Sequence, residues 1–185
     1  MNNLQKVLEN FIDKNQDKKT VENSSIVISQ VTYWTNKEPD LTDIILKLIL
    51  ENNFHVLDSE EEDKVEYFVQ NYIIKNWRNG AASQHLKTIC HQIIRHQQKT
   101  KVLLKLYQVL SSEKVQTDDT LEVKALLQSN LLVTEHGQLK VHNPIYKAVF
   151  SKEWVEEELE SVNKLQPSPR DIEKNQTTDK FNIIN

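Results

Sequence analysis

The residues best suited to chemistry gather in one short stretch, which holds four potential metal ligands: His85, Cys90, His91 and His96. A zinc site needs its ligands to converge on one point with closed tetrahedral geometry. On a helix, Cys90 and His91 point about 100° apart, and His85 and His96 lie too far apart along the axis. We therefore expect no metal in this stretch and interpret Cys90 as a core residue.

The same spacing argues against a cysteine nucleophile. Adjacent residues on a helix are badly placed for proton transfer, so His91 cannot activate Cys90, and no group supplies an oxyanion hole. The acidic run Glu60-Glu61-Glu62-Asp63 offers paired carboxylates. Acids at a helix start oppose the helix dipole, however, and need no further role. No catalytic set emerges, so we expect a protein that is not an enzyme.

Composition narrows the class further. Two glycines and four prolines in 185 residues leave little room for a glycine-rich phosphate loop and favour a mostly helical chain. The net charge of −4 and the pI near 5.9 argue against a general nucleic-acid coat protein. A single cysteine suits a reducing compartment. No apolar run approaches the roughly 20 residues of a membrane span, and the first residues lack a signal-peptide core. We expect a cytoplasmic protein without membrane contact.

Charge is unevenly distributed. Between Glu66 and Glu113 the chain has none of its 27 acids but seven of its 23 cations. Five of these cations form the predicted partner-binding set: Lys87, Arg95, Lys99, Lys101 and Lys105. Two interpretations stay open: a surface for an anionic partner, or a face that complements the acidic ends of the same molecule.

Periodic apolar residues predict a series of helices. Helices are expected from Leu4, from Ser24 or Ser25, from Asp40 or Thr42, and from Ser59 to Trp77. A helix that begins near Ser83 should either continue past Gln97-Gln98 or restart after that pair, and a further helix should begin at Asp118 or Asp119. Between the last of these and a helix at Asn143-Pro144 lies a hairpin signal, Leu131 to Val141, with Gly137 in its turn. A short strand at Glu113–Val115 and a final helix from Ser151 complete the pattern, and residues 166–185 should form a disordered tail.

This order of elements, with the segments given below, resembles the C-terminal part of the AAA-like domain of large cyanobacterial signalling proteins. In those proteins the domain commonly accompanies β-propeller repeats or other modules. Where the family shows W-T-G-G-Q-P-x-L-T, this chain has Trp34-Thr35, Pro39, Leu41 and Thr42. The other matching segments, in chain order, are Ile73–Trp77, His85–Ile89, Leu103–Tyr107, Leu139–Asn143, Ile145-Tyr146, Val149-Phe150 and Trp154-Val155. Together they span roughly Ile26 to Leu159.

The departures from this family limit what the resemblance implies. The family binds ATP at an upstream phosphate-binding loop, and no G-x-x-x-x-G-K-[ST] occurs here, so ATP binding and hydrolysis are not carried over. The paired glycines before the proline are replaced, since Asn36-Lys37-Glu38 fill that interval. The family's S-G-L-V before the wing is Ser129-Asn130-Leu131-Leu132. The chain is similar to the lid and winged-helix half of such a protein.

The sequence therefore predicts a mostly α protein: a helical bundle over residues 1–80, a winged-helix-like module over 81–165 and a tail over 166–185. We expect a non-enzymatic regulatory or adaptor protein with no cofactor, acting through contacts with a protein partner, in particular an acidic one. The alternative is a nucleic-acid-binding winged-helix regulator that uses the basic helices. Acids at Asp118, Asp119, Glu122 and Glu135 oppose the usual docking of a winged helix on DNA. A relic of a larger gene without activity is a third interpretation.

Overall fold

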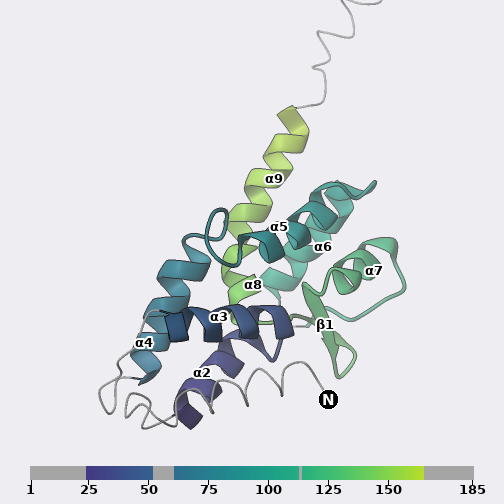
Figure 1. Ribbon diagram of the computed structural model, residues 1–185. Coiled ribbons are helices and arrows are strands. Elements are labelled where there is room, and N and C mark those ends of the chain that lie inside the picture. Colours follow the sequence, from purple (N-terminus) through teal and green to yellow (C-terminus); the bar gives the residue numbers. More distant parts are fainter. Residues whose placement is uncertain (1–23, 52–60, 113, 165–185) are drawn as a thin grey trace, which may run out of the picture.

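The structure, a computed structural model, describes residues 24–51, 61–112 and 114–164. Within them the chain forms eight α-helices, one π-helical turn and one two-stranded sheet (Figure 1). The predicted mostly helical fold with a small β-hairpin is confirmed. The predicted helix from Leu4, the capping Ser59 and the tail 166–185 lie outside the described residues. No helix of the described part is long and apolar enough to cross a membrane.

The N-terminal helices are α2 (Ser24–Thr35), α3 (Pro39–Glu51) and α4 (Glu61–Phe68), drawn in purple and blue in Figure 1. Their apolar residues recur every three or four positions, so they share one face of each helix. On α2 this face buries Val27 and Val31, and on α3 it buries Leu41, Ile45 and Ile49. These positions agree with the periodicity read from the sequence.

The loop between α2 and α3 has an unusual backbone. Asn36 and Lys37 have φ angles of 47° and 62°, in the left-handed region that favours glycine. The resembled family has glycine at both positions. The prediction that α3 begins at Asp40 or Thr42 was wrong, because the helix begins at Pro39 itself. Proline fits the first helical position, where its missing N–H has no partner to lose.

The helix predicted to reach Trp77 changes its hydrogen bonding earlier. After α4, residues Val69–Ile74 form a π-helical turn, η1, and Lys75 donates to the carbonyl five residues back, at Gln70. The chain then turns at Gly80. A Cβ there would lie 2.8 Å from the Tyr72 carbonyl oxygen and 2.9 Å from that of Asn76, so only glycine fits. The glycine at this turn thus has a steric cause.

Three helices follow: α5 (Ser83–Ile94), α6 (Lys99–Ser111) and α7 (Leu121–Gln128). Of the two alternatives at Gln97-Gln98, the structure has the restart, since α5 ends at Ile94 and α6 begins at Lys99. The predicted cap of α7 by an aspartate was wrong, because Thr120 occupies that position and Asp118 Oδ1 instead accepts the Thr120 N–H at 3.0 Å. The strand predicted at 113–115 begins at a residue outside the described ranges, and next to it the structure has an isolated bridge between Gln116 and Gln138.

The hairpin consists of β1 (Leu132–Glu135) and β2 (Gln138–Val141), which pair antiparallel with Leu132 opposite Val141. Its two-residue loop, His136-Gly137, has φ angles of 50° and 77°. Positive φ at both positions is the geometry of a type I′ turn, whose twist matches that of the strands. The predicted hairpin and its glycine are confirmed.

After the hairpin, α8 (Pro144–Val149) packs against α2 and η1, and α9 (Lys152–Lys164) packs along α6 (Figure 1). Asn143 caps α8 as predicted, since its Oδ1 accepts the Tyr146 N–H at 2.8 Å, the bond that a capping side chain makes. One cluster of buried apolar residues runs from Val27 to Val155. The predicted boundary near Gly80 therefore crosses a continuous core.

Candidate functional site

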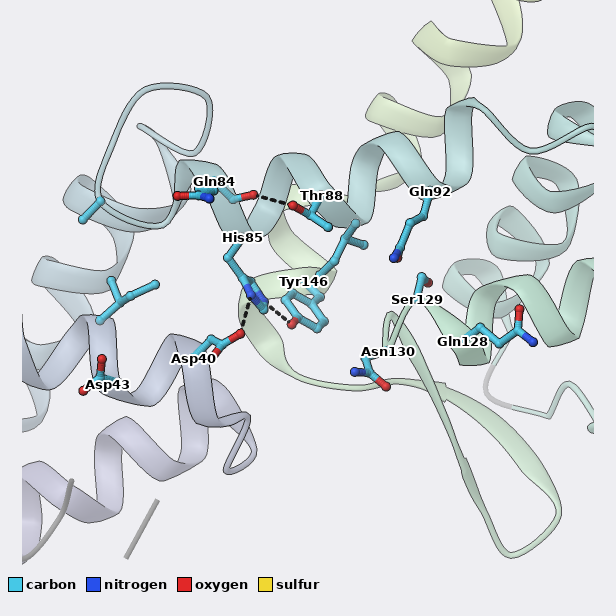
Figure 2. Close-up of a pocket in the computed structure, with 13 residues that line it drawn as sticks. Asp40, Asp43, Gln84, His85, Thr88, Gln92, Gln128, Ser129, Asn130 and Tyr146 are labelled. Carbon is cyan, nitrogen blue, oxygen red and sulfur yellow. Dashed lines mark hydrogen bonds and ion pairs between the residues drawn. The ribbon is translucent and has the colours of Figure 1, made fainter. Parts of the chain in front are cut away.

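A pocket of about 570 Å³ opens where the N-terminal helices meet the C-terminal half. Its walls come from α3, α5, the segment after α7, and α8. Figure 2 shows His85 reaching from α5 toward Asp40 and Tyr146, with Gln92, Ser129 and Asn130 on the other side. The pocket wall is mostly polar, and its only charged side chains near His85 are carboxylates. It is therefore suited to a polar or cationic occupant.

His85 contacts three polar side chains in this pocket. Its Nε2 lies 2.7 Å from the Tyr146 hydroxyl, at hydrogen-bond distance. Its Nδ1 lies 3.4 Å from an Asp40 carboxylate oxygen, and its Nε2 lies 3.8 Å from Glu38 Oε2. Both ring nitrogens thus face oxygen atoms, which fixes the orientation of the imidazole between α3 and α8.

Glu38 and Asp40 are positioned by the start of α3. Glu38 is the residue before the helix, and its Oε2 accepts the Leu41 N–H at 2.7 Å, as a capping side chain does. Glu38 is buried, at 7% exposure, whereas the Asp40 side chain is 70% exposed. The positive end of α3 stabilises both carboxylates.

Tyr146 and Asn143 form the buried side of the cluster. Tyr146 is fully buried, and this burial raises the pKa of its hydroxyl far above the ordinary value. The nearby Glu38 carboxylate raises it further, to a smaller extent. Asn143 acts in the opposite direction, since its side chain lowers this pKa. Asn143 is 3% exposed, and its Nδ2 has no hydrogen-bond partner among the described residues. Asn143 and Tyr146 thus lie next to each other on the buried side of the cluster.

The basic residues predicted to bind a partner divide into two groups. Lys99 Nζ lies 2.7 Å from Glu158 on α9, and Lys105 Nζ lies 3.2 Å from Asp118. Lys87, Arg95 and Lys101 are exposed, and none forms an ion pair within the part of the chain that the structure describes. Internal acids therefore compensate two of the five charges.

A second pocket, of about 440 Å³, lies between the end of α6, β2 and α8. Its apolar wall consists of the partly exposed Leu110 and Val141, with the buried Val109 and Leu139 behind them. Three lysines also border it: Lys114, Lys140 and Lys147. We call this pocket the lysine groove. Lys140 lies 2.5 Å from Glu135 across the hairpin, whereas Lys114 and Lys147 are exposed.

Sequence reasoning considered different ligands from those that the fold brings together. Cys90 is buried, and burial raises the pKa of its thiol, while His91 is exposed and His96 Nδ1 accepts the Gln98 N–H. Within the described ranges, the group of three potential ligands that does converge is Glu38, Asp40 and His85. No spacing rule could reveal it, because α3 and α5 are far apart in the sequence.

Comparisons with known proteins identify a relative of part of the chain. The chain matches no protein-family model, and it matches no solved structure. It is 31% identical over 146 residues to an uncharacterized WD repeat-containing protein of the cyanobacterium Synechocystis sp.. The match covers 76% of this chain but only 12% of that protein, so the chain corresponds to a small part of a much longer relative.

Proposed function

We propose that the chain is a non-enzymatic regulatory or adaptor module that acts through protein–protein contacts, and that an acidic, partly apolar segment of its partner binds in the lysine groove. The observation that carries this proposal is the combination, in one groove, of an apolar wall with exposed lysines on its border. An apolar wall provides the area that a partner buries. The lysines select the sign of the partner's charge and speed its encounter.

The charges around the groove favour an acidic partner. Lys114 and Lys147 are exposed and have no ion-pair partner among the described residues, so a docked carboxylate has no internal acid to displace there. Lys140 is already paired with Glu135 and contributes less. We therefore prefer the lysine groove to the lysines of α6 as the binding site, because two of those lysines already form ion pairs with Glu158 and Asp118.

The resemblance and the relative support a modular role. The Synechocystis relative is named for WD repeats, which form the blades of β-propellers, as in the resembled signalling family. Asn36, Lys37 and Asn130 stand where that family has glycine, and all three have positive φ. The order α6, Gln116 bridge, α7, hairpin supports the winged-helix interpretation of residues 81–165.

The nucleic-acid alternative keeps one supporting observation. Lys87, Arg95 and Lys101 are exposed without internal ion pairs among the described residues, so they remain available to phosphates. Phosphate contacts make binding strongly dependent on salt concentration. The two functions can therefore be separated by the residues on which binding depends.

The test selects phage-displayed 12-residue peptides on the purified chain and measures their affinity for three proteins: wild type, Lys147→Glu and the control Lys101→Glu. We expect selected peptides rich in acidic and apolar residues, which Lys147→Glu weakens about tenfold and Lys101→Glu does not. A 20-base-pair DNA duplex is titrated in parallel. Peptides without acids, equal losses in both variants, or tighter Lys101-dependent binding of the duplex would contradict the proposal. So would ATP hydrolysis at an ordinary enzymatic rate.

A further inference from the structure

We propose that Glu38, Asp40 and His85 bind a divalent transition-metal ion that links the start of α3 to α5. Each residue offers one ligand atom, and the three atoms lie within 4.8 Å of one another. Carboxylate oxygens and imidazole nitrogens bind such ions at about 2.0–2.2 Å, so two ligands of one ion lie at most about 4.4 Å apart. Closing the site therefore needs small side-chain movements, which the exposed Asp40 can supply.

The buried carboxylate of Glu38 gives the first reason to expect a cation. Buried charges in proteins are either paired or bound to a metal, because removing an isolated charge from water is costly. Glu38 is 7% exposed, and no lysine or arginine of the described chain lies within ion-pair distance of it. Its hydrogen-bond donor is the Leu41 N–H, and the His85 ring is nearby. A divalent ion held by both carboxylates would supply two positive charges at this position.

The hydrogen bonds behind His85 give the second reason. A histidine that binds a metal usually donates its other ring N–H to a fixed acceptor, which sets the tautomer. Nε2 of His85 faces the buried Tyr146 hydroxyl at 2.7 Å and Glu38 Oε2 at 3.8 Å, whereas Nδ1 faces Asp40, so Glu38 has to turn toward the Nδ1 side to share an ion with Asp40. If Nε2 carries the proton, the Nδ1 lone pair is free to bind the ion.

The ligand set also indicates the class of ion. Imidazole favours zinc, iron and nickel over magnesium and calcium, and carboxylates extend the set to manganese. Three protein ligands leave at least one position open, on the side where the pocket meets solvent. Zinc is the most useful probe, because it binds N and O ligands more tightly than manganese or iron does.

The experiment measures Zn²⁺ binding to the full, tag-free chain by calorimetry, with Co²⁺ absorption as a spectroscopic reading of the ligands. We expect one ion per chain, with affinity reduced at least tenfold by His85→Gln and by Asp40→Asn. Asp40 is largely exposed, so Asp40→Asn should fold normally even if His85→Gln disturbs Tyr146. Far-ultraviolet circular dichroism of each variant checks the fold.

Two matched controls should keep wild-type affinity within threefold. Asp43→Asn changes a carboxylate in the same pocket that is paired with Lys47 at 2.6 Å. His91→Gln changes an exposed histidine on the same helix as His85. Absence of binding at 100 micromolar Zn²⁺, or a loss in the controls equal to that in Asp40→Asn, would overturn the proposal.

Discussion

At the scale of single residues, the backbone of the α2–α3 loop is strained at Lys37, whose side chain is exposed. Lys37 has a φ of 62°. A non-glycine residue in this left-handed region costs roughly 1–2 kcal/mol. Asn36 next to it, at 47°, is better tolerated, because asparagine adopts this conformation more readily. Its Nδ2 also donates to the His142 carbonyl at 2.8 Å, which fixes the loop against the C-terminal half.

We predict that Lys37→Gly stabilises the protein. Glycine removes the left-handed strain but loses more freedom on folding, so the net gain should be about 0.5–1 kcal/mol. Urea unfolding should show a higher midpoint with an unchanged slope. Lys87→Gly on α5 is the control, since an exposed helical site should lose about 1 kcal/mol. A lower midpoint for Lys37→Gly would show that the lysine side chain has a stabilising role.

The residues of the candidate site show why sequence patterns find some sites and miss others. The start of α8 at Asn143-Pro144 was predictable because the capping residue and the proline are adjacent in the sequence. Glu38 and His85 meet only in the folded chain, where the start of α3 lies beside the first turn of α5. Their pairing depends on tertiary structure, so no periodicity or spacing encodes it.

At the scale of elements, α9 explains much of the charge asymmetry. This helix carries five glutamates and packs along α6, where Lys99 meets Glu158 and Tyr107 meets Glu156. The glutamate next to Tyr107 raises the pKa of its hydroxyl. The acid-free stretch and the acidic C-terminal helix are thus partners within one molecule over at least part of their length.

We predict that Lys99 and Glu158 are coupled. Their side chains are 21% and 25% exposed, so solvent screens their attraction only partly. A double-mutant cycle with Lys99→Met and Glu158→Gln should give a coupling free energy of about 1 kcal/mol that decreases with added salt. The control pair, Lys124 and Asp119, is 3.7 Å apart and far more exposed, and should show no measurable coupling. Equal coupling in both pairs would contradict this explanation.

Elements with strong local signals were predictable, and elements shaped by packing were not. The hairpin follows from a positive-φ glycine between apolar strands, and α5 and α6 follow from their periodic faces. The π-helical turn could not be predicted, because Val69 and Ile73 are apolar at a spacing that an α-helix would also show. The hydrogen bonds of this turn span five residues and change the direction in which the chain leaves the helix. Gly80 then permits the tight turn that follows.

At the scale of the whole molecule, the core joins the two regions that the sequence divided near Gly80. Phe150 links them directly: its ring lies 6.2 Å from Trp77, which follows η1, and 5.1 Å from Trp154 on α9. α8 also packs on α2. Composition gave no sign of this, because an aromatic residue at a periodic position looks the same whether it packs within its own region or across a boundary.

We predict that the described part of the chain unfolds in one transition. Two single-tryptophan variants report on opposite regions: one keeps Trp34 on α2 and the other keeps Trp154 on α9, with the remaining tryptophans changed to phenylalanine. Both side chains are buried, so unfolding should alter their fluorescence. Since one core cluster holds both, their denaturation midpoints in urea should coincide, the usual test of two-state behaviour. Separate midpoints would instead mean that residues 24–80 and 81–164 fold as independent units and that α8 docks weakly between them. In that case the pocket at His85 would open before either region unfolds.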